Sequence, residues 1–112
     1  MAQKHPLVIG NWKMNPQKES EAVTLAKAVA MSSKKSTGVT IVIAPPTLFV
    51  GAVAKAVKKS ALNLGVQQVH PGPVGAFTGM VSPAQCREYG VSYAIVGHSE
   101  SRARGESDSM VN

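Results

Sequence analysis

The sequence lacks the features that mark secreted, membrane-spanning and nucleic-acid-binding proteins. Its 112 residues include one cysteine, which excludes an internal disulfide and favours a reducing compartment. No apolar run approaches the roughly 18 residues of a membrane span, and the polar first six residues do not resemble a signal peptide. Aromatic residues make up only 4% of the chain and are not interleaved with basic ones. We therefore expect a cytoplasmic protein with no membrane and no nucleic-acid partner.

Acidic residues are also scarce. Twelve Lys and Arg residues outnumber six Asp and Glu residues, which gives a net charge of +6. An excess of basic residues can favour binding to nucleic acid, to a membrane surface or to an acidic partner. The basic residues are scattered, however, and Lys34-Lys35 and Lys58-Lys59 fall near predicted helix ends, where a cation favours the helix dipole. We interpret most of this charge as a solvated face, and the rest as serving an anionic substrate or an acidic companion chain.

What the chain does contain is a regular alternation of strand and helix patterns. Hydrophobic residues make up 44% and charged residues 16%, a globular composition whose length allows a single domain over residues 1–112. Apolar runs predict strands over 7–11, 39–43, 61–66 and 92–96. Helical spacing predicts helices over 17–32, 48–59 and 83–89. This order predicts an α/β fold with a parallel sheet and right-handed crossovers.

Local signals set the expected helix ends. Asn15 can cap the first helix, with Pro16 in its first turn. Ser82 can cap the third helix, with Pro83 in its first turn and Gly90 as its stop. Cys86 lies within that third helix, where we expect an inert, part-buried thiol.

Two of the predicted strands run directly into polar loops. The apolar run 94–96, typical of a strand covered on both faces, is followed by Gly97, His98 and Glu100. The run 7–9 is followed by Gly10, and then by Asn11 and Lys13. Ligands bind at the carboxyl ends of parallel strands. A single histidine after one strand is more often structural, but two such strand ends together predict an active site.

Three motifs carry a family resemblance. They are Gly10-Asn11-Trp12-Lys13-Met14-Asn15, Gly75-Ala76-Phe77-Thr78-Gly79 and Val96-Gly97-His98-Ser99-Glu100. In this order and spacing they resemble the triose-phosphate isomerase family, over essentially the whole chain. A barrel of eight strand–helix units takes about 250 residues. The resemblance therefore implies the amino-terminal half of a (β/α)8 TIM barrel, as a natural half-length product or as a fragment. We expect four parallel strands, three helices and the start of a fourth over residues 106–112.

The resemblance also implies a reaction. Members of this family interconvert dihydroxyacetone phosphate and glyceraldehyde 3-phosphate in glycolysis and gluconeogenesis, through an enediolate and without a cofactor. As is established for this family, a glutamate is the base and a neutral histidine polarises the carbonyl. His98 matches that histidine. Lys13 matches the lysine that attracts the phosphate and steadies the oxyanion, the alternative being a surface lysine.

The remaining site residues follow from the same resemblance. Asn11 matches a hydrogen-bond donor to the substrate oxygen, the alternative being a structural asparagine at a strand end. Glu100 matches a carboxylate that orients Lys13 and His98. Ser99 contributes through its hydroxyl or its backbone N–H. No metal site is expected, because His5, His70 and His98 lack ligand spacing.

The third motif lies in a long loop over residues 67–79, rich in Gly and Pro. The resemblance implies that this loop reaches the active site of a partner subunit, with Thr78 at its tip and Phe77 and Gly79 beside it. The alternative is a loop packed on its own barrel. Met80 follows where the family commonly has a glutamate, so we expect an exposed methionine beside this interface.

Two features depart from a working family member. The segment 101–105 is one residue shorter than in the family and lacks one of two arginines, which puts ion pairing of Glu106 in doubt. The catalytic glutamate and the phosphate-binding loops belong to the missing half, and no acidic residue here is a credible substitute. We therefore expect negligible activity from the chain alone. The expected partners are a carboxy-terminal half chain, copies of the chain itself as a homo-oligomer, and a triose phosphate. The alternative is a self-assembling, catalytically silent half barrel.

Overall fold

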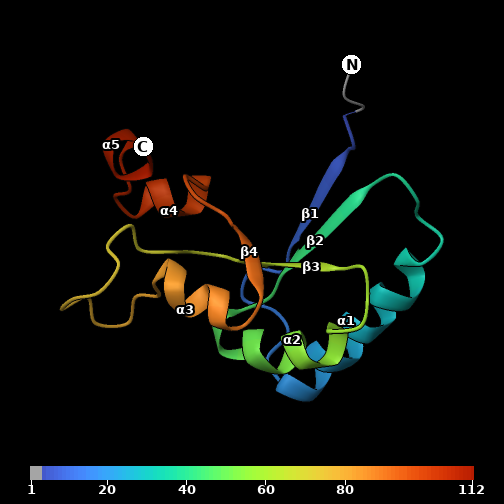
Figure 1. Cartoon of the computed structure of the whole chain (residues 1–112). Helices are drawn as coiled ribbons and strands as arrows, with labels where there is room; N and C mark the ends of the chain where they lie inside the picture. The colour runs from blue at the N-terminus through green and yellow to red at the C-terminus, as the bar shows by residue number, and fades with distance from the viewer. Residues whose placement is uncertain (1–3) are drawn as a thin grey trace.

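The computed structural model describes residues 4–112 (Figure 1). Strands and helices alternate along the chain, and the predicted bounds agree with the observed ones to within about two residues at most ends. The elements are β1 (Leu7–Asn11), α1 (Glu19–Ser33), β2 (Thr40–Ala44), the 3-10 turn η1 (Thr47–Phe49), α2 (Val50–Val57), β3 (Asn63–Val66), α3 (Pro83–Glu88), β4 (Val91–Ala94), α4 (Ser99–Ala103) and α5 (Asp108–Val111).

The four strands form one parallel sheet in the order β1-β2-β3-β4. Five residues of β1 pair in register with β2, from Leu7 opposite Thr40 to Asn11 opposite Ala44. The register between β3 and β4 shifts after Leu64, where a bulge follows. Strand order that follows chain order, with a helix in each crossover, is the arrangement of half of a (β/α)8 barrel. The predicted fold class is therefore confirmed.

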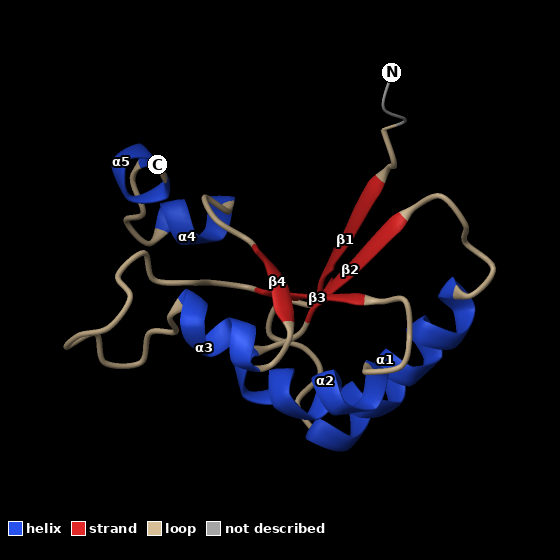
Figure 2. Cartoon of the chain, in the orientation of Figure 1, coloured by secondary structure: helices blue, strands red, loops and turns tan. Residues whose placement is uncertain are grey.

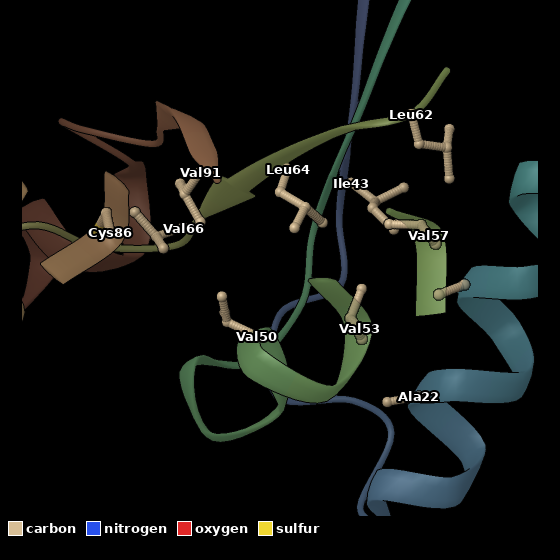
Figure 3. Close-up of a cluster of buried hydrophobic side chains, with 11 residues drawn as sticks. Ala22, Ile43, Val50, Val53, Val57, Leu62, Leu64, Val66, Cys86 and Val91 are labelled. Carbon is tan, nitrogen blue, oxygen red and sulfur yellow. The ribbon is translucent and has the colours of Figure 1, made fainter. Parts of the chain in front are cut away.

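Helices cover one face of this sheet. Figure 2 shows α1, α2 and α3 together on the same side of the strands. The core lies between them: Ile43, Leu64 and Val91 of the sheet meet Val53 of α2 and Ala22 of α1, all of them buried (Figure 3). Adjacent residues of a strand point to opposite faces. Alternate strand residues therefore face away from these three helices.

The prediction that residues 94–96 form a strand covered on both faces is wrong. The strand ends at Ala94, and Val96 is 53% exposed. In β1, Leu7, Val8 and Ile9 are also between 43% and 55% exposed, so neither face of this strand is fully covered.

The predicted start of the first helix is also wrong. Helix α1 begins at Glu19, and its N-cap is Lys18, which makes no side-chain cap hydrogen bond. The preceding residues form a loop, in which the Gln17 side chain donates to the carbonyl of Met14 at 2.6 Å. Asn15 and Pro16 lie in this loop, before the helix.

The third helix has the ends that its sequence predicts. The Ser82 hydroxyl accepts from the Gln85 backbone N–H at 3.2 Å, and the Gln85 side chain accepts from the Ser82 N–H at 2.9 Å. This reciprocal pair is a capping box. Gly90, with φ of +75°, follows the helix and has the left-handed backbone that glycine tolerates. Cys86 is buried, and burial raises the pKa of its thiol.

In the part of the chain that the structure describes, no helix is long and apolar enough to cross a membrane. Among residues 4–112, His, Cys, Asp and Glu side chains also form no group of three that could hold a metal ion.

Candidate active site

A polar cavity of about 140 Å³ lies at the carboxyl ends of β1, β3 and β4. Its lining residues come from four separate loops and helix ends. They are Asn11, Lys13, Thr47, Gln67, Gln68, Ile95, His98, Glu100, Ser101 and Arg104. The structure thus brings together four of the predicted site residues, from both predicted strand ends. Ser99 begins α4 and does not line the cavity.

Lys13 is held from two directions. Its ammonium lies 2.9 Å from a carboxylate oxygen of Glu100. Its backbone has φ of +55°, in the left-handed region that a non-glycine residue seldom adopts. The Asn11 side-chain oxygen accepts from the Lys13 N–H at 2.9 Å, within the same turn. Asn11 therefore shapes the loop with its oxygen. Its NH2 group has no hydrogen-bond partner among residues 4–112 and can donate to a ligand.

Glu100 is an anion at this site under ordinary conditions. The hydrogen bond from Lys13 holds the pKa of its carboxyl below the ordinary value, and the charges of Lys13, His98 and Arg104 act in the same direction. The second carboxylate oxygen lies 3.7 Å from Nδ1 of His98. The carboxylate of Glu100 thus holds the lysine, whereas its 3.7 Å separation from Nδ1 is too long for a hydrogen bond to the histidine.

The geometry around His98 fixes the tautomer of its neutral ring. Its Nδ1 accepts a hydrogen bond from the Glu100 backbone N–H at 3.0 Å, which requires a lone pair on Nδ1. In the neutral ring the proton is then on Nε2, which becomes a hydrogen-bond donor. The same contact makes His98 the N-cap of α4. The side chain is 28% exposed, so a ligand in the cavity can reach it.

The segment after His98 forms a short helix, α4, where the sequence predicted only a loop. Arg102 of this helix donates from Nε to the carbonyl of Gly97 at 2.9 Å and pairs through Nη1 with Asp108 of α5. Glu106 takes part in no ion pair of the described residues, and its Oε1 is buried without a hydrogen-bond partner. Arg102 is therefore paired with Asp108 and not with Glu106.

Gln67 is a site residue that the sequence reading missed. Its side-chain NH2 donates to the carbonyl of Lys13 at 2.7 Å and to that of Ala44 at 2.9 Å. This amide therefore ties the Lys13 loop to the end of β2 and supports the left-handed backbone of Lys13. Its position was the available signal, since Gln67 follows β3 at the same end of the sheet as Asn11 and His98.

The long loop after β3 extends away from the sheet (Figure 1). Phe77 stacks on His70 with 3.8 Å between ring centroids, and His70 Nδ1 accepts from the Gly72 N–H at 2.9 Å. Phe77 is still 45% exposed, and Thr78, Gly79 and Met80 are exposed as well. Of the loop, only Gln67 and Gln68 line the cavity. The predicted contact of Phe77, Thr78 and Gly79 with a partner subunit stays a prediction.

Comparison with known proteins decides the family. The model of the family described as triosephosphate isomerase matches residues 6–112, nearly the whole chain. The chain belongs to the triosephosphate isomerase family. Curated relatives bearing that name include one from Psychromonas ingrahamii, 41% identical over 107 residues, and one from Carboxydothermus hydrogenoformans, 40% identical over 110 residues.

The matches cover nearly all of this chain but less than half of each relative. The matches take in 95% and 97% of this chain but only 42% and 43% of the two relatives. A third relative, from Rhodopirellula baltica, is 41% identical over 94% of this chain and 41% of its own length. The chain thus spans about two fifths of the length of these triosephosphate isomerases. Together with the four-stranded sheet, this share fits the amino-terminal half of the family's barrel.

Proposed function

We propose that this chain supplies the electrophilic half of a triose-phosphate isomerase active site. The observation that carries the proposal is the hydrogen bond from the Glu100 N–H to Nδ1 of His98. It leaves Nε2–H as the donor of a neutral imidazole, in a cavity shared with Lys13 and Asn11. A neutral donor of this kind polarises a substrate carbonyl, as is established for this family.

Each residue then has a role in moving a proton between adjacent carbons of a triose phosphate. His98 donates from Nε2 to the carbonyl oxygen, where negative charge develops in the enediolate. Lys13 attracts the anionic substrate and stabilises the same charge. The NH2 group of Asn11 donates to a substrate oxygen. Glu100 holds Lys13 in place through the 2.9 Å ion pair.

The proton on carbon needs a base that this chain does not supply. Within residues 4–112, Glu100 is the carboxylate that lines the cavity, and it is bonded to Lys13. A base tied to an ammonium group has a lowered pKa and is a weak proton acceptor. General acid–base catalysis contributes about 10²- to 10⁴-fold. We therefore expect negligible activity until a carboxy-terminal half brings the family's glutamate and phosphate loops.

Two kinds of partner could cover the exposed surface of the sheet: a carboxy-terminal half chain, or further copies of this chain. A carboxy-terminal half chain would complete the barrel, and the loop with Phe77, Thr78 and Gly79 would then contact a partner subunit. The second candidate function is a self-assembling, catalytically silent half barrel. It is favoured by the apolar side chains of β1, since Leu7 and Val8 are 50% and 55% exposed.

The deciding experiment mixes this chain with a chain that contains the carboxy-terminal half of a triosephosphate isomerase relative. Isomerase activity on dihydroxyacetone phosphate and the molar mass are measured for each chain and for the mixture. We expect activity only in the mixture, and a loss of about 10²- to 10³-fold on His98→Gln, because a flexible amide replaces the preorganised imidazole donor. Lys13→Ala should also lose activity, whereas Lys27→Ala, on the exposed side of α1, is the control that should not.

Two outcomes would contradict the proposal. Activity of this chain alone would show that the missing base is dispensable. Activity in the mixture that is indifferent to His98→Gln would remove the electrophilic role. An inactive mixture together with a stable oligomer of this chain would favour the silent half barrel.

A further inference from the structure

The segment that departs from the family carries a second cation into the cavity. Helix α4 ends at Ala103, and Arg104 is its C-cap, with the backbone N–H directed to the carbonyl groups of Ser101 and Arg102. The Arg104 side chain lines the same cavity as Lys13, His98 and Glu100. Among the residues whose roles the family resemblance implies, Lys13 is the positive group at this end of the sheet. Those roles assign no function to Arg104.

The charges in the cavity are not balanced. Lys13 is paired with Glu100 at 2.9 Å, and Nδ1 of His98 accepts from the Glu100 backbone N–H. Among residues 4–112, Arg104 takes part in no ion pair. Its side chain makes a long hydrogen bond of 3.4 Å from Nη2 to the Ser101 hydroxyl. A guanidinium has five N–H donors, so most of those of Arg104 are available to a ligand.

The cavity also has the size and the neutral donors for an oxyanion. Its volume of about 140 Å³ equals the share of four or five waters at roughly 30 Å³ each. That space is enough for a phosphate group, which has five heavy atoms. Thr47, Gln68 and Ser101 line it with a hydroxyl or an amide. Guanidinium groups bind tetrahedral oxyanions through two parallel hydrogen bonds.

We propose that Arg104 binds the phosphate group of a small phosphorylated anion in this cavity. The proposal rests on the proposed function for its substrate class, a triose phosphate. It adds a residue of this chain that contacts the phosphate group directly. Binding should weaken with salt, because Arg104 is exposed and its charge is screened within about 10 Å at 0.1 M ionic strength.

Titration of the 112-residue chain with inorganic phosphate tests the proposal. Amide chemical shifts of Gln68, Ser101 and Arg104 are followed by NMR at pH 7 and low ionic strength. We expect saturable shifts, a dissociation constant about tenfold weaker in Arg104→Gln, and an intermediate value in Arg104→Lys, which keeps the charge but not the fork of donors. Arg87→Gln is the matched control, because Arg87 lies on α3, carries the same charge and does not line this cavity.

Three results would overturn the proposal. Arg104→Gln could bind phosphate as the parent does, Arg87→Gln could lose as much affinity as Arg104→Gln, or sodium chloride of equal ionic strength could produce the same shifts. The assay is independent of isomerase activity. If the mixture of halves is inactive but the chain still binds phosphate through Arg104, the proposed function alone is refuted. If the mixture is active but Arg104→Gln binds phosphate as tightly as the parent, this inference alone is refuted.

Discussion

Lys13 and Glu100 lie 87 positions apart in the sequence and are joined by an ion pair of 2.9 Å. Both side chains are about half exposed, at 55% and 52%. Exposed pairs of this kind add little to stability. The pair is therefore better understood as a positioning device, which holds the ammonium of Lys13 over the end of the sheet where His98 also lies.

The pair should be visible in the titration of Glu100. Its carboxyl has a pKa below the ordinary value of 4.5, chiefly because of the hydrogen bond from Lys13. A lowered pKa in the folded state means that the pair is complete above about pH 4.5 and is lost as the pH falls through the lower, folded value. We expect Lys13→Met to move the pKa of Glu100 upward, toward 4.5, as measured by NMR of the side-chain carboxyl.

Lys27→Met is the control for this titration, because it removes the same charge from the exposed side of α1. It should leave the Glu100 titration unchanged. An equal upward shift in both variants would mean that net charge, and not the contact with Lys13, lowers the pKa.

Single residues differ in how far the sequence determines them. The placement of Asn11, Lys13, His98 and Glu100 at one end of the sheet follows from strand periodicity, since parallel strands end at a common edge. The position of Gln67 follows in the same way, but the partners of its amide do not. Its two hydrogen bonds depend on the left-handed turn at Lys13. The residue types in 10–15 do not predict that backbone conformation.

At the scale of elements, α1 and α3 begin in opposite ways. Helix α3 has the reciprocal box of Ser82 and Gln85, whereas α1 begins after Lys18 without a side-chain cap. Replacing an N-cap serine by alanine costs about 1 kcal/mol of stability. We expect Ser82→Ala to lower the free energy of unfolding by about that amount, as measured by urea denaturation followed by circular dichroism.

Ser20→Ala is the matched control for the cap, since Ser20 is an exposed residue inside α1. Alanine is the better helix former there, so stability should stay the same or rise slightly. If Ser82→Ala were also neutral, the box would contribute nothing to the fold.

The elements that the sequence predicted best are those with a strong local signal. Strand β1 was predicted at its observed bounds, and Ser82, Pro83 and Gly90 bracket α3 as expected. Helix α4 was missed because its five residues are too few to show a periodicity. Its first turn depends on a contact from the His98 ring to a backbone N–H, which no pattern of apolar residues encodes.

At the scale of the molecule, the described chain is an open sheet with α1, α2 and α3 on one side (Figure 2). Strands β1 and β4 each pair with one neighbour, so each offers an edge of unpaired N–H and C=O groups. Near the β1 edge, Leu7, Val8 and Ile9 are between 43% and 55% exposed. Burying such apolar area is worth about 25 cal/mol per Å². The sheet therefore favours any partner that covers it.

This surface predicts that the 112-residue chain self-associates when no other half is present. Its mass in sedimentation equilibrium should exceed 11.7 kDa and rise with concentration. Ile9→Thr should weaken the association, because threonine keeps the β-branched shape that suits a strand but removes apolar area. Leu48→Thr is the control: Leu48 is 89% exposed but lies in η1, away from the strand edges, and should change nothing. A chain that stays monomeric at all concentrations, or that associates equally well with Ile9→Thr, would mean that the β1 edge is not the contact surface.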